Sequence, residues 1–436
     1  MDWDESTYAE IAKETLLAHQ FINLHYFSLP WFEKPPLMIW LTAASFTIFG
    51  FTEFAARFWV AILAIATVST TYFFVKKAFA SELAAFLSVL SYFIIFYYTF
   101  YARTLFFDVP VTFFILSAVF MFWLALERSK YFYLFWIALA FGFMTKSVIG
   151  LLPLPIAGIY LIYTKKFEAV RKRNFYWGFL IFLGIIAPWH ILEFVQFGEN
   201  FLRPYFGYHV MQRFFSTLGN HSGGLGFYSF IFTQNFLLLV LTLWSVPHFL
   251  VAMRKNKRAY ALCFISAVFI FLFFSTAGTK LANYIVPVVP FVAIMSGVTL
   301  ADYIREIRRQ LPKILIISAL FIIFIGLDFG YVRDVVKVNL GWQYNQYLQA
   351  DMKSDYEIKN AGEYFSTHYI NIPLYTTISQ YTYPEFSYYA GRSMLIADKI
   401  HTPTQRELDS STKIFSNRDS NFFTMNDYIY ATSTSE

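Results

Sequence analysis

The sequence has 436 residues, of which 57% are hydrophobic and only 14% are charged. Soluble domains carry about 25% charged residues, so this composition excludes an ordinary soluble protein and indicates many lipid-facing helices. The single cysteine, Cys263, excludes a disulfide framework or a cysteine-based metal site within one chain. The formal net charge of +6 indicates nucleic-acid binding only if the basic residues gather on a soluble surface.

The first 54 residues are interpreted as an outward-facing loop with two helices at the membrane interface. Within 6–19, apolar residues recur at helical spacing. Residues 36–50 are apolar but number only about 15, whereas a span needs roughly 20. A span here would also invert every later loop, so an interfacial helix is the better interpretation. Carboxylates open the chain with no apolar run ahead of them, and we therefore expect a further span upstream of Met1.

Ten spans are predicted after this loop. They cover 55–75, 82–101, 109–127, 131–145, 148–164, 175–195, 226–252, 259–277, 282–300 and 312–329. The loops between them alternate between a set rich in Lys and Arg and a sparser set, and the positive-inside rule assigns the basic set to the cytoplasm. The positive charge is therefore an orientation signal rather than a nucleic-acid footprint.

Residues 330–436 are polar and tyrosine-rich, unlike a membrane segment. Their pattern predicts a helix over 354–367, a strand over 371–378, a helix over 383–390 and then a short strand. A small extracytoplasmic α/β domain is therefore expected after the all-α bundle at 55–329.

The outward loops hold the residues of chemical interest. Four of the cations in these loops could form one pocket: Lys34, Lys146, Arg213 and Lys280. Three of the carboxylates are candidate bases: Asp4, Glu5 and Asp108. Arg can bind a phosphate bidentately and Lys acts as a point charge, while a carboxylate beside cations stays ionised and can accept the proton of an attacking hydroxyl. The set indicates group transfer from a phosphate donor carried on a lipid.

Plainer interpretations of these residues stay open. Lys34 and Lys280 stand near span ends, where lysines commonly anchor a helix at the interface. Asp108 precedes Val-Pro and could cap a helix as well as act chemically. His209 alone is more often a hydrogen-bonded loop histidine than a metal ligand. The gathering of several independent polar sites on one face favours a functional site.

Five segments, in order, carry a resemblance to a known family. They are DESTYAEIAKETL, FEKPPLMIWLTAASFTIFGFTEFAARF, ARTLFFDVP, MTKSVIGLLP and KLANYIVPVVP. Together they resemble the polyprenyl-phosphate-sugar glycosyltransferases with the GT-C fold, in particular the aminoarabinose transferases of lipid A and the related protein O-mannosyltransferases. The resemblance runs from residue 2 to about 300, and the EKPPL block is its most specific part.

The resemblance implies a role for each matching residue. The acidic positions are Asp4 as the catalytic base, Glu5 beside it, and Asp108 near the reacting atoms. The donor-phosphate cavity would be made by Lys34, Arg213, Lys280, Lys146 and Tyr284. The sugar or acceptor pocket would include Tyr8 and Trp31. Positions that hold a metal in a relative are matched by Glu33 and His209, although the chemistry of this class does not need a metal.

The expected protein is an integral-membrane glycosyltransferase of the plasma (inner) membrane. It would move a sugar from a polyprenyl-phosphate donor to a hydroxyl of an extracytoplasmic lipid, glycan or protein by an inverting displacement. No cofactor is required, because fixed Lys and Arg side chains can stabilise the departing phosphate; any divalent metal would be structural. A lipid or polysaccharide transporter and an inactive lipid-binding member of the same fold are the alternatives.

Overall fold

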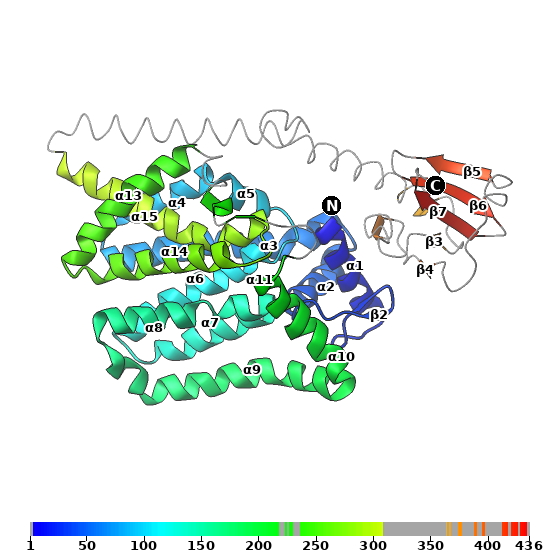
Figure 1. The fold of residues 1–436 in the computed structure, drawn as a ribbon, viewed down its shortest axis with the longest axis horizontal. Coiled ribbons are helices and arrows are strands. Elements are labelled where there is room, and N and C mark those ends of the chain that lie inside the picture. The colour runs from blue at the N-terminus through cyan, green and yellow to red at the C-terminus, as the bar shows by residue number, and fades with distance from the viewer. Residues whose placement is uncertain are drawn as a thin grey trace. The chain divides into compact units, whose positions relative to one another are not determined.

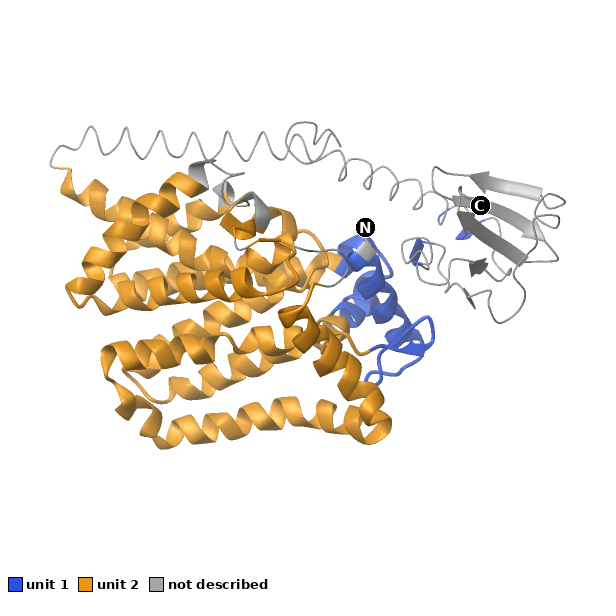
Figure 2. Cartoon of the chain, in the orientation of Figure 1, with its two compact units in different colours: residues 1–31, 42–56, 333–436 blue, residues 32–41, 57–332 orange. Residues whose placement is uncertain are grey.

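The computed structural model describes residues 3–217, 223–224, 226–229 and 236–307, together with short segments beyond 362. The chain forms two compact units (Figure 2). Unit 1 combines residues 1–31, 42–56 and 333–436, and unit 2 combines residues 32–41 and 57–332.

Unit 1 begins with helix α1 (Trp3–Leu17), followed by a hairpin of β1 (His25–Tyr26) and β2 (Leu29–Pro30). The predicted helix over 6–19 is confirmed as α1, and its apolar face is buried. The carboxylate of Glu14 accepts hydrogen bonds from the backbone N–H groups of Phe27 and Ser28, at 3.0 and 3.2 Å. The helix and the hairpin are therefore held together by these two hydrogen bonds as well as by apolar packing.

The later part of unit 1 is a five-stranded sheet in the order β4-β3-β7-β6-β5. Its strands are β3 (Leu374–Thr376), β4 (Leu395–Ile396), β5 (Thr412–Ser416), β6 (Ser420–Met425) and β7 (Tyr428–Ser433). Strand β3 pairs in parallel with β4 and β7, whereas β5, β6 and β7 pair antiparallel. The predicted strand over 371–378 contains β3, but the antiparallel strands were not predicted. The helices predicted over 354–367 and 383–390 lie mostly outside the described residues.

Unit 2 is helical, as Figure 1 shows. Helix α2 (Leu37–Phe49) and the first turn of α3 (Glu53–Phe79) are shared with unit 1. The bundle then contains α4 (Glu82–Ile94), α5 (Phe96–Tyr101), α6 (Asp108–Ala125), α7 (Tyr131–Lys146), α8 (Pro153–Thr164) and α9 (Arg173–Phe197). Shorter pieces follow as α10 (Glu199–Leu202), a π-helix (Arg203–Gln212) and α11 (Arg213–Phe215). The last described helices are α13 (Phe236–Arg254), α14 (Arg258–Thr276) and α15 (Val289–Glu306).

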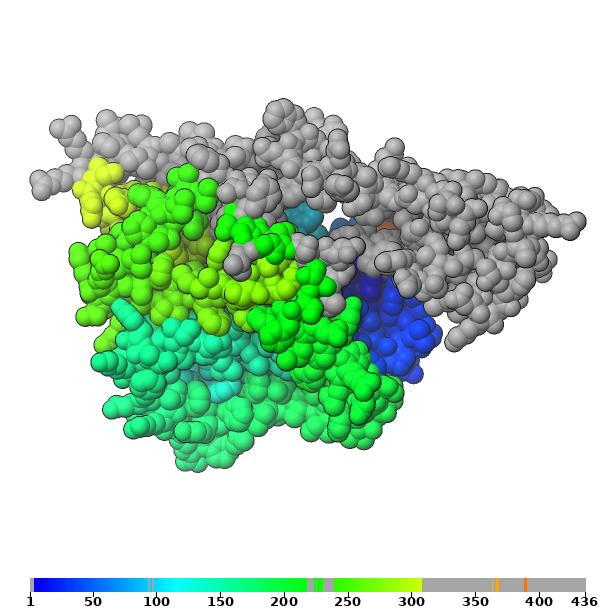
Figure 3. All heavy atoms as spheres, in the orientation of Figure 1, coloured from blue at the N-terminus to red at the C-terminus, as the bar shows by residue number. Residues whose placement is uncertain are grey.

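Six helices of the described residues are long and apolar enough to cross a membrane, and four shorter apolar helices accompany them. The prediction of a multi-span helical protein is therefore confirmed. Helix α9 keeps a row of large apolar side chains exposed, among them Leu180, Ile191 and Val195, and it lies along the lower border of unit 2 in Figures 1 and 3. Such a surface is suited to lipid. The predicted tenth span, 312–329, lies outside the described residues.

The predicted span over 82–101 is wrong in one respect, because the chain breaks at Ile95 into α4 and α5. On either side of the break, a buried tyrosine directs its hydroxyl to a hydrogen-bond partner. The hydroxyl of Tyr92 shares a hydrogen bond of 2.6 Å with Thr71, and the hydroxyl of Tyr98 donates to the carbonyl oxygen of Ala64 at 3.0 Å. Both partners lie on α3, so the turn at Ile95 satisfies two phenolic groups on one neighbouring helix.

Unit 2 has two chemically different ends. We call one of them the basic end: it holds the end of α3, the α6–α7, α8–α9 and α13–α14 connections, and the end of α15. These segments touch, since Lys77 lies 3.9 Å from Glu127 and the Tyr163 hydroxyl donates to the Met253 carbonyl at 2.8 Å. These two contacts agree with the predicted gathering of the basic loops, and the side of the membrane on which they lie stays a prediction. The opposite end of the same helices, called here the cavity end, carries the start of α6, the end of α7 and the segment from 277 to 288.

Candidate functional site

A cavity of about 320 Å³ opens at the cavity end of unit 2. This volume is in the range of small-ligand sites. Its polar and charged lining residues are Glu33, Lys34, Lys146, Ser147, His209, Arg213, Thr279 and Tyr284. The rest of the lining is apolar, with Val148, Ile149, Val210, Met211, Phe214, Phe215, Phe273, Phe274 and Ala277. A few cations in an otherwise apolar wall suit an anionic head group that is joined to an apolar chain.

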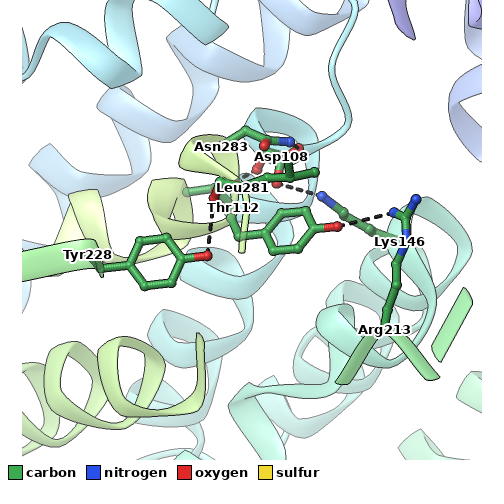
Figure 4. Close-up of polar contacts among 8 residues, drawn as sticks. Asp108, Thr112, Lys146, Arg213, Tyr228, Leu281 and Asn283 are labelled. Atoms are coloured by element: carbon green, nitrogen blue, oxygen red, sulfur yellow. Dashed lines mark hydrogen bonds and ion pairs between the residues drawn. The ribbon is translucent and has the colours of Figure 1, made fainter. Parts of the chain in front are cut away.

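Lys146 is fixed at the end of α7 by the carboxylate that begins α6. Its ammonium lies 2.5 Å from Asp108 Oδ1, and the side chains of both residues are largely buried. The second oxygen, Oδ2, accepts a hydrogen bond of 2.8 Å from Asn283 Nδ2 (Figure 4). Both carboxylate oxygens are thus occupied, so Asp108 holds Lys146 in place in this arrangement. The interpretation of Asp108 as a helix N-cap is wrong, because Asp108 is the first residue of α6 and the N-cap residue is Phe107.

The turn after Lys146 depends on two glycines. Residues 147–151 fold back against α7 as a 3₁₀ turn, with Ser147 at a positive φ of 48°. A Cβ atom on Gly150 would lie only 2.0 Å from the carbonyl carbon of Gly142. The turn can therefore pack against α7 only because Gly150 lacks a side chain, and a Cβ atom on Gly142 would also be tightly placed, 3.2 Å from Gly150.

Arg213 reaches the cavity from the end of the π-helix. Its segment is tied to the 277–280 turn, since Gly278 N donates to Phe214 O at 2.7 Å and Thr279 N donates to Arg213 O at 3.1 Å. A Cβ atom on Gly278 would lie 2.7 Å from the Ser216 carbonyl oxygen, so this approach needs glycine. The guanidinium of Arg213 donates to the Tyr284 hydroxyl at 3.1 Å.

Two of the cations of the cavity also lie over aromatic rings. The Lys146 ammonium lies 4.9 Å from the centre of the Tyr284 ring, and the Lys34 ammonium lies 5.2 Å from that of Phe107. Arg213 Nε is buried and has no acceptor among the described residues. An unused guanidinium donor in a cavity calls for an explanation, and a bound anion would supply one.

His209 lines the same cavity as these cations. Burial, together with the positive charges of Arg213 and Lys34, lowers the pKa of His209 to about 3. The imidazole is therefore neutral at ordinary pH. Glu33 and His209 line the same cavity, yet no group of three or more His, Cys, Asp or Glu side chains suited to a metal exists in the part of the chain that is described. One carboxylate and one imidazole among three cations do not fit a divalent ion.

The other predicted residues lie elsewhere. Asp4 and Glu5 stand in the first turn of α1, in unit 1, where Glu5 is buried and Asp4 is half-buried. Tyr8 and Trp31, also in unit 1, are buried against each other with ring centres 6.2 Å apart. In unit 2, Lys280 is not among the described residues that line the cavity, and its ammonium donates to the Ala277 carbonyl at 2.6 Å.

The structure thus brings Lys34, Lys146 and Arg213 to one cavity and uses Lys280 to close a backbone turn. The sequence interpretation overlooked Asn283, which holds Asp108, and Thr279, whose hydroxyl donates to the Ser216 carbonyl at 2.8 Å. Both stand in the segment that carries Lys280 and Tyr284. Each is a polar residue directly beside a predicted site residue in the sequence, and this position could have identified it.

Comparison with known proteins gives a consistent group. The family model for dolichyl-phosphate-mannose-protein mannosyltransferases matches residues 33–192. An undecaprenyl phosphate-alpha-4-amino-4-deoxy-L-arabinose arabinosyl transferase from Edwardsiella ictaluri is 27% identical over 363 residues, which cover 78% of this chain and 61% of the relative. A similar transferase from Proteus mirabilis is 29% identical over 338 residues, which cover 74% and 59%. The chain spans about six-tenths of the length of these curated relatives.

Among solved structures, ArnT from Cupriavidus metallidurans bound to undecaprenyl phosphate matches with a TM-score of 0.71 at 21% identity, covering 90% of this chain and 81% of that one. The resemblance read from the sequence is confirmed. The chain has the GT-C fold, is related in sequence to the transferases named above, and is a multi-pass membrane protein.

Proposed function

We propose that the protein is a membrane glycosyltransferase that takes a sugar from a polyprenyl-phosphate donor and passes it to a hydroxyl group. The observation that carries the proposal is the buried Nε of Arg213, which has no acceptor among the described residues and belongs to a cavity with two further cations. Relatives named for undecaprenyl-phosphate or dolichyl-phosphate donors support the donor class.

In this proposal the phosphate of the donor lies against Lys34, Lys146 and Arg213. Lys146 is already neutralised in part by Asp108, whereas Arg213 has an Nε donor with no acceptor among the described residues, so Arg213 is the stronger partner for new negative charge. As the bond between sugar and phosphate breaks, charge grows on the phosphate oxygens. Cations fixed in an apolar wall stabilise that charge without reorganising, and this favours the transition state. The apolar lining accommodates the start of the polyprenyl chain.

The acceptor hydroxyl needs a base, and both oxygens of Asp108 are engaged by Lys146 and Asn283. We therefore assign the base to Asp4, as the resemblance implies, with Glu5 as its buried neighbour. The hydroxyl oxygen attacks the anomeric carbon, its proton passes to Asp4, and the polyprenyl phosphate departs, which inverts the configuration. Tyr8 and Trp31 are assigned to the sugar or acceptor, and no step uses a metal.

The test compares cells with and without the gene by mass spectrometry of membrane lipids and envelope glycans. We expect a sugar to disappear from one acceptor and its polyprenyl-phosphate donor to accumulate. Accumulation of an untransferred lipid on one leaflet, with every acceptor unchanged, would instead support the transporter. No change in any lipid or glycan would support an inactive lipid-binding member of the fold.

A further inference from the structure

A second cavity, of about 470 Å³, lies at the basic end of unit 2, and the donor proposal does not use it. It sits at the start of α14, whereas Ala277, just past the end of the same helix, lines the first cavity. A helix of 19 residues is roughly 28 Å long, so the two cavities are separate. The charged residues of its lining are Lys257, Arg258, Asp302 and Arg305.

The cations of this cavity outnumber its carboxylate by three to one among the described lining residues. Asp302 is engaged several times over: the Tyr260 hydroxyl donates to Oδ2 at 2.5 Å, and His248 Nε2 lies 2.9 Å from the same oxygen. Arg305 lies 3.8 Å from the other oxygen of Asp302 and also donates to the hydroxyl of Ser81. The carboxylate therefore has little capacity left to neutralise Lys257 and Arg258.

The start of α14 adds partial positive charge. Lys257 is its N-cap residue, with extended backbone, and no side chain among the described residues accepts a hydrogen bond at this cap. The first N–H groups of a helix have no partner within the helix, and the helix dipole favours an anion there. Two cationic side chains and a helix terminus thus converge on one hollow.

Apolar side chains also line part of the same cavity. Phe79, Trp123 and Val298 line it together with the ring of Tyr260, over which the Lys257 ammonium lies at 5.0 Å. Trp123 contributes an indole N–H that is buried and has no acceptor among the described residues. Apolar side chains beside the cations suit a lipid, which presents a phosphate joined to acyl chains.

We propose that this cavity binds the phosphate group of an anionic membrane lipid from the leaflet at the basic end. The helices that form it belong to a multi-pass membrane protein, so lipid phosphates surround it at high local concentration. The proposal is independent of the donor site and of glycosyl transfer. It predicts that one lipid molecule stays with the protein when the bulk lipid is removed.

The test uses the full chain purified in a neutral detergent and titrated with phosphatidylglycerol, with binding followed by native mass spectrometry. The test variant is Lys257→Gln with Arg258→Gln. The matched control is Arg171→Gln with Lys172→Gln, which removes the same charges at another basic loop, where Lys172 is the N-cap residue of α9. We expect the test variant to lose roughly 10- to 30-fold in affinity for the first lipid, since each of the two basic residues contributes roughly three- to fivefold.

The control should stay within about twofold of the wild type. Equal losses in both variants would overturn a specific site and leave only surface charge. Phosphatidylcholine binding as tightly as phosphatidylglycerol would overturn the anionic requirement. Full displacement of the lipid by millimolar inorganic phosphate would overturn the lipid in favour of a free phosphate. A circular-dichroism melt checks that both variants are folded, and a third variant, Trp123→Phe, should weaken the same first binding event without any change of charge.

Discussion

The two ends of α14 hold the same residue types in different physical settings. At its Arg258 end, Lys and Arg come from connections between helices, and the side chain of Arg305 is 51% exposed. At its Thr276 end, the cations come from three separate segments, and the side chain of Lys146 is only 14% exposed. Charge that is out of water must be paired, and Lys146 accordingly has a partner within 2.5 Å in Asp108, whereas the half-exposed Arg305 lies 3.8 Å from Asp302. We therefore place the proposed chemistry at the Thr276 end, where the cations are fixed.

The largest effect is expected from Arg213→Ala. It removes the donor that has no acceptor among the described residues, so product formation should fall roughly 100- to 1,000-fold, as for the loss of one transition-state donor. The matched change at the basic end is Arg254→Ala, at the exposed end of α13, which should leave activity within about twofold. The measurement is the amount of modified acceptor in complemented cells. Equal losses from both changes would remove the distinction between the ends.

A loss of stability is expected from Asp108→Asn. The change leaves the buried ammonium of Lys146 without its counter-charge, which costs about 3–5 kcal/mol. Glu82→Gln breaks the exposed pair with Lys76 and should leave the unfolding temperature unchanged. Thermal unfolding in detergent measures both. Partial recovery is expected in Asp108→Asn with Lys146→Met, and its failure would mean that Asp108 stabilises the fold through Asn283 instead.

A more local change is Gly278→Ala, which should push the Ser216 backbone and with it the segment that carries Arg213. We expect roughly a tenfold loss of affinity for undecaprenyl phosphate, because one charged hydrogen bond is worth about 1.5–3 kcal/mol and is only misplaced here. Gly207→Ala is the control, since nothing lies within 4 Å of a Cβ atom there. A fluorescent polyprenyl phosphate provides the binding assay. Normal binding by Gly278→Ala would mean that the turn does not set the position of Arg213.

The smallest effect concerns pH. The pKa of His209 is lowered to about 3 in the folded protein, while an unfolded histidine titrates near 6.5. Between these values the unfolded state binds a proton that the folded state does not, so the stability falls as the pH falls below about 6.5. His209→Gln should lessen this decline by a few degrees of unfolding temperature between pH 7 and pH 5. An identical decline in the variant would show that other groups cause it.

Much of this arrangement could be predicted because it depends on composition and on order along the chain. Apolar runs between basic loops predicted the bundle and the gathering of cations at one end. Lys34, Lys146 and Arg213 were predicted as neighbours because their loops fall on the same side, and they line one cavity. Alternation of loops, however, places a residue at an end of the bundle and says nothing about where its side chain points.

That limit explains the differences. Lys280 satisfies these rules as well as Lys146 does, but its ammonium meets the carbonyl of Ala277, a contact decided by the tight turn at Gly278. The break at Ile95 depends on where Thr71 and the Ala64 carbonyl lie on another helix, which no local pattern encodes. Contacts across long separations in sequence decided both outcomes.

Cys263 has a practical consequence. It is the one thiol of the chain, and it is buried within α14, between the two cavities. A membrane-impermeant maleimide should leave the folded protein unlabelled, so any cysteine introduced at the surface becomes its only reactive thiol. One such cysteine can be placed beside each cavity, for example by Phe215→Cys or Asn256→Cys. Labelling in sealed vesicles then reports on which side of the membrane each cavity lies. The reagent added outside should reach one of the two positions and not the other.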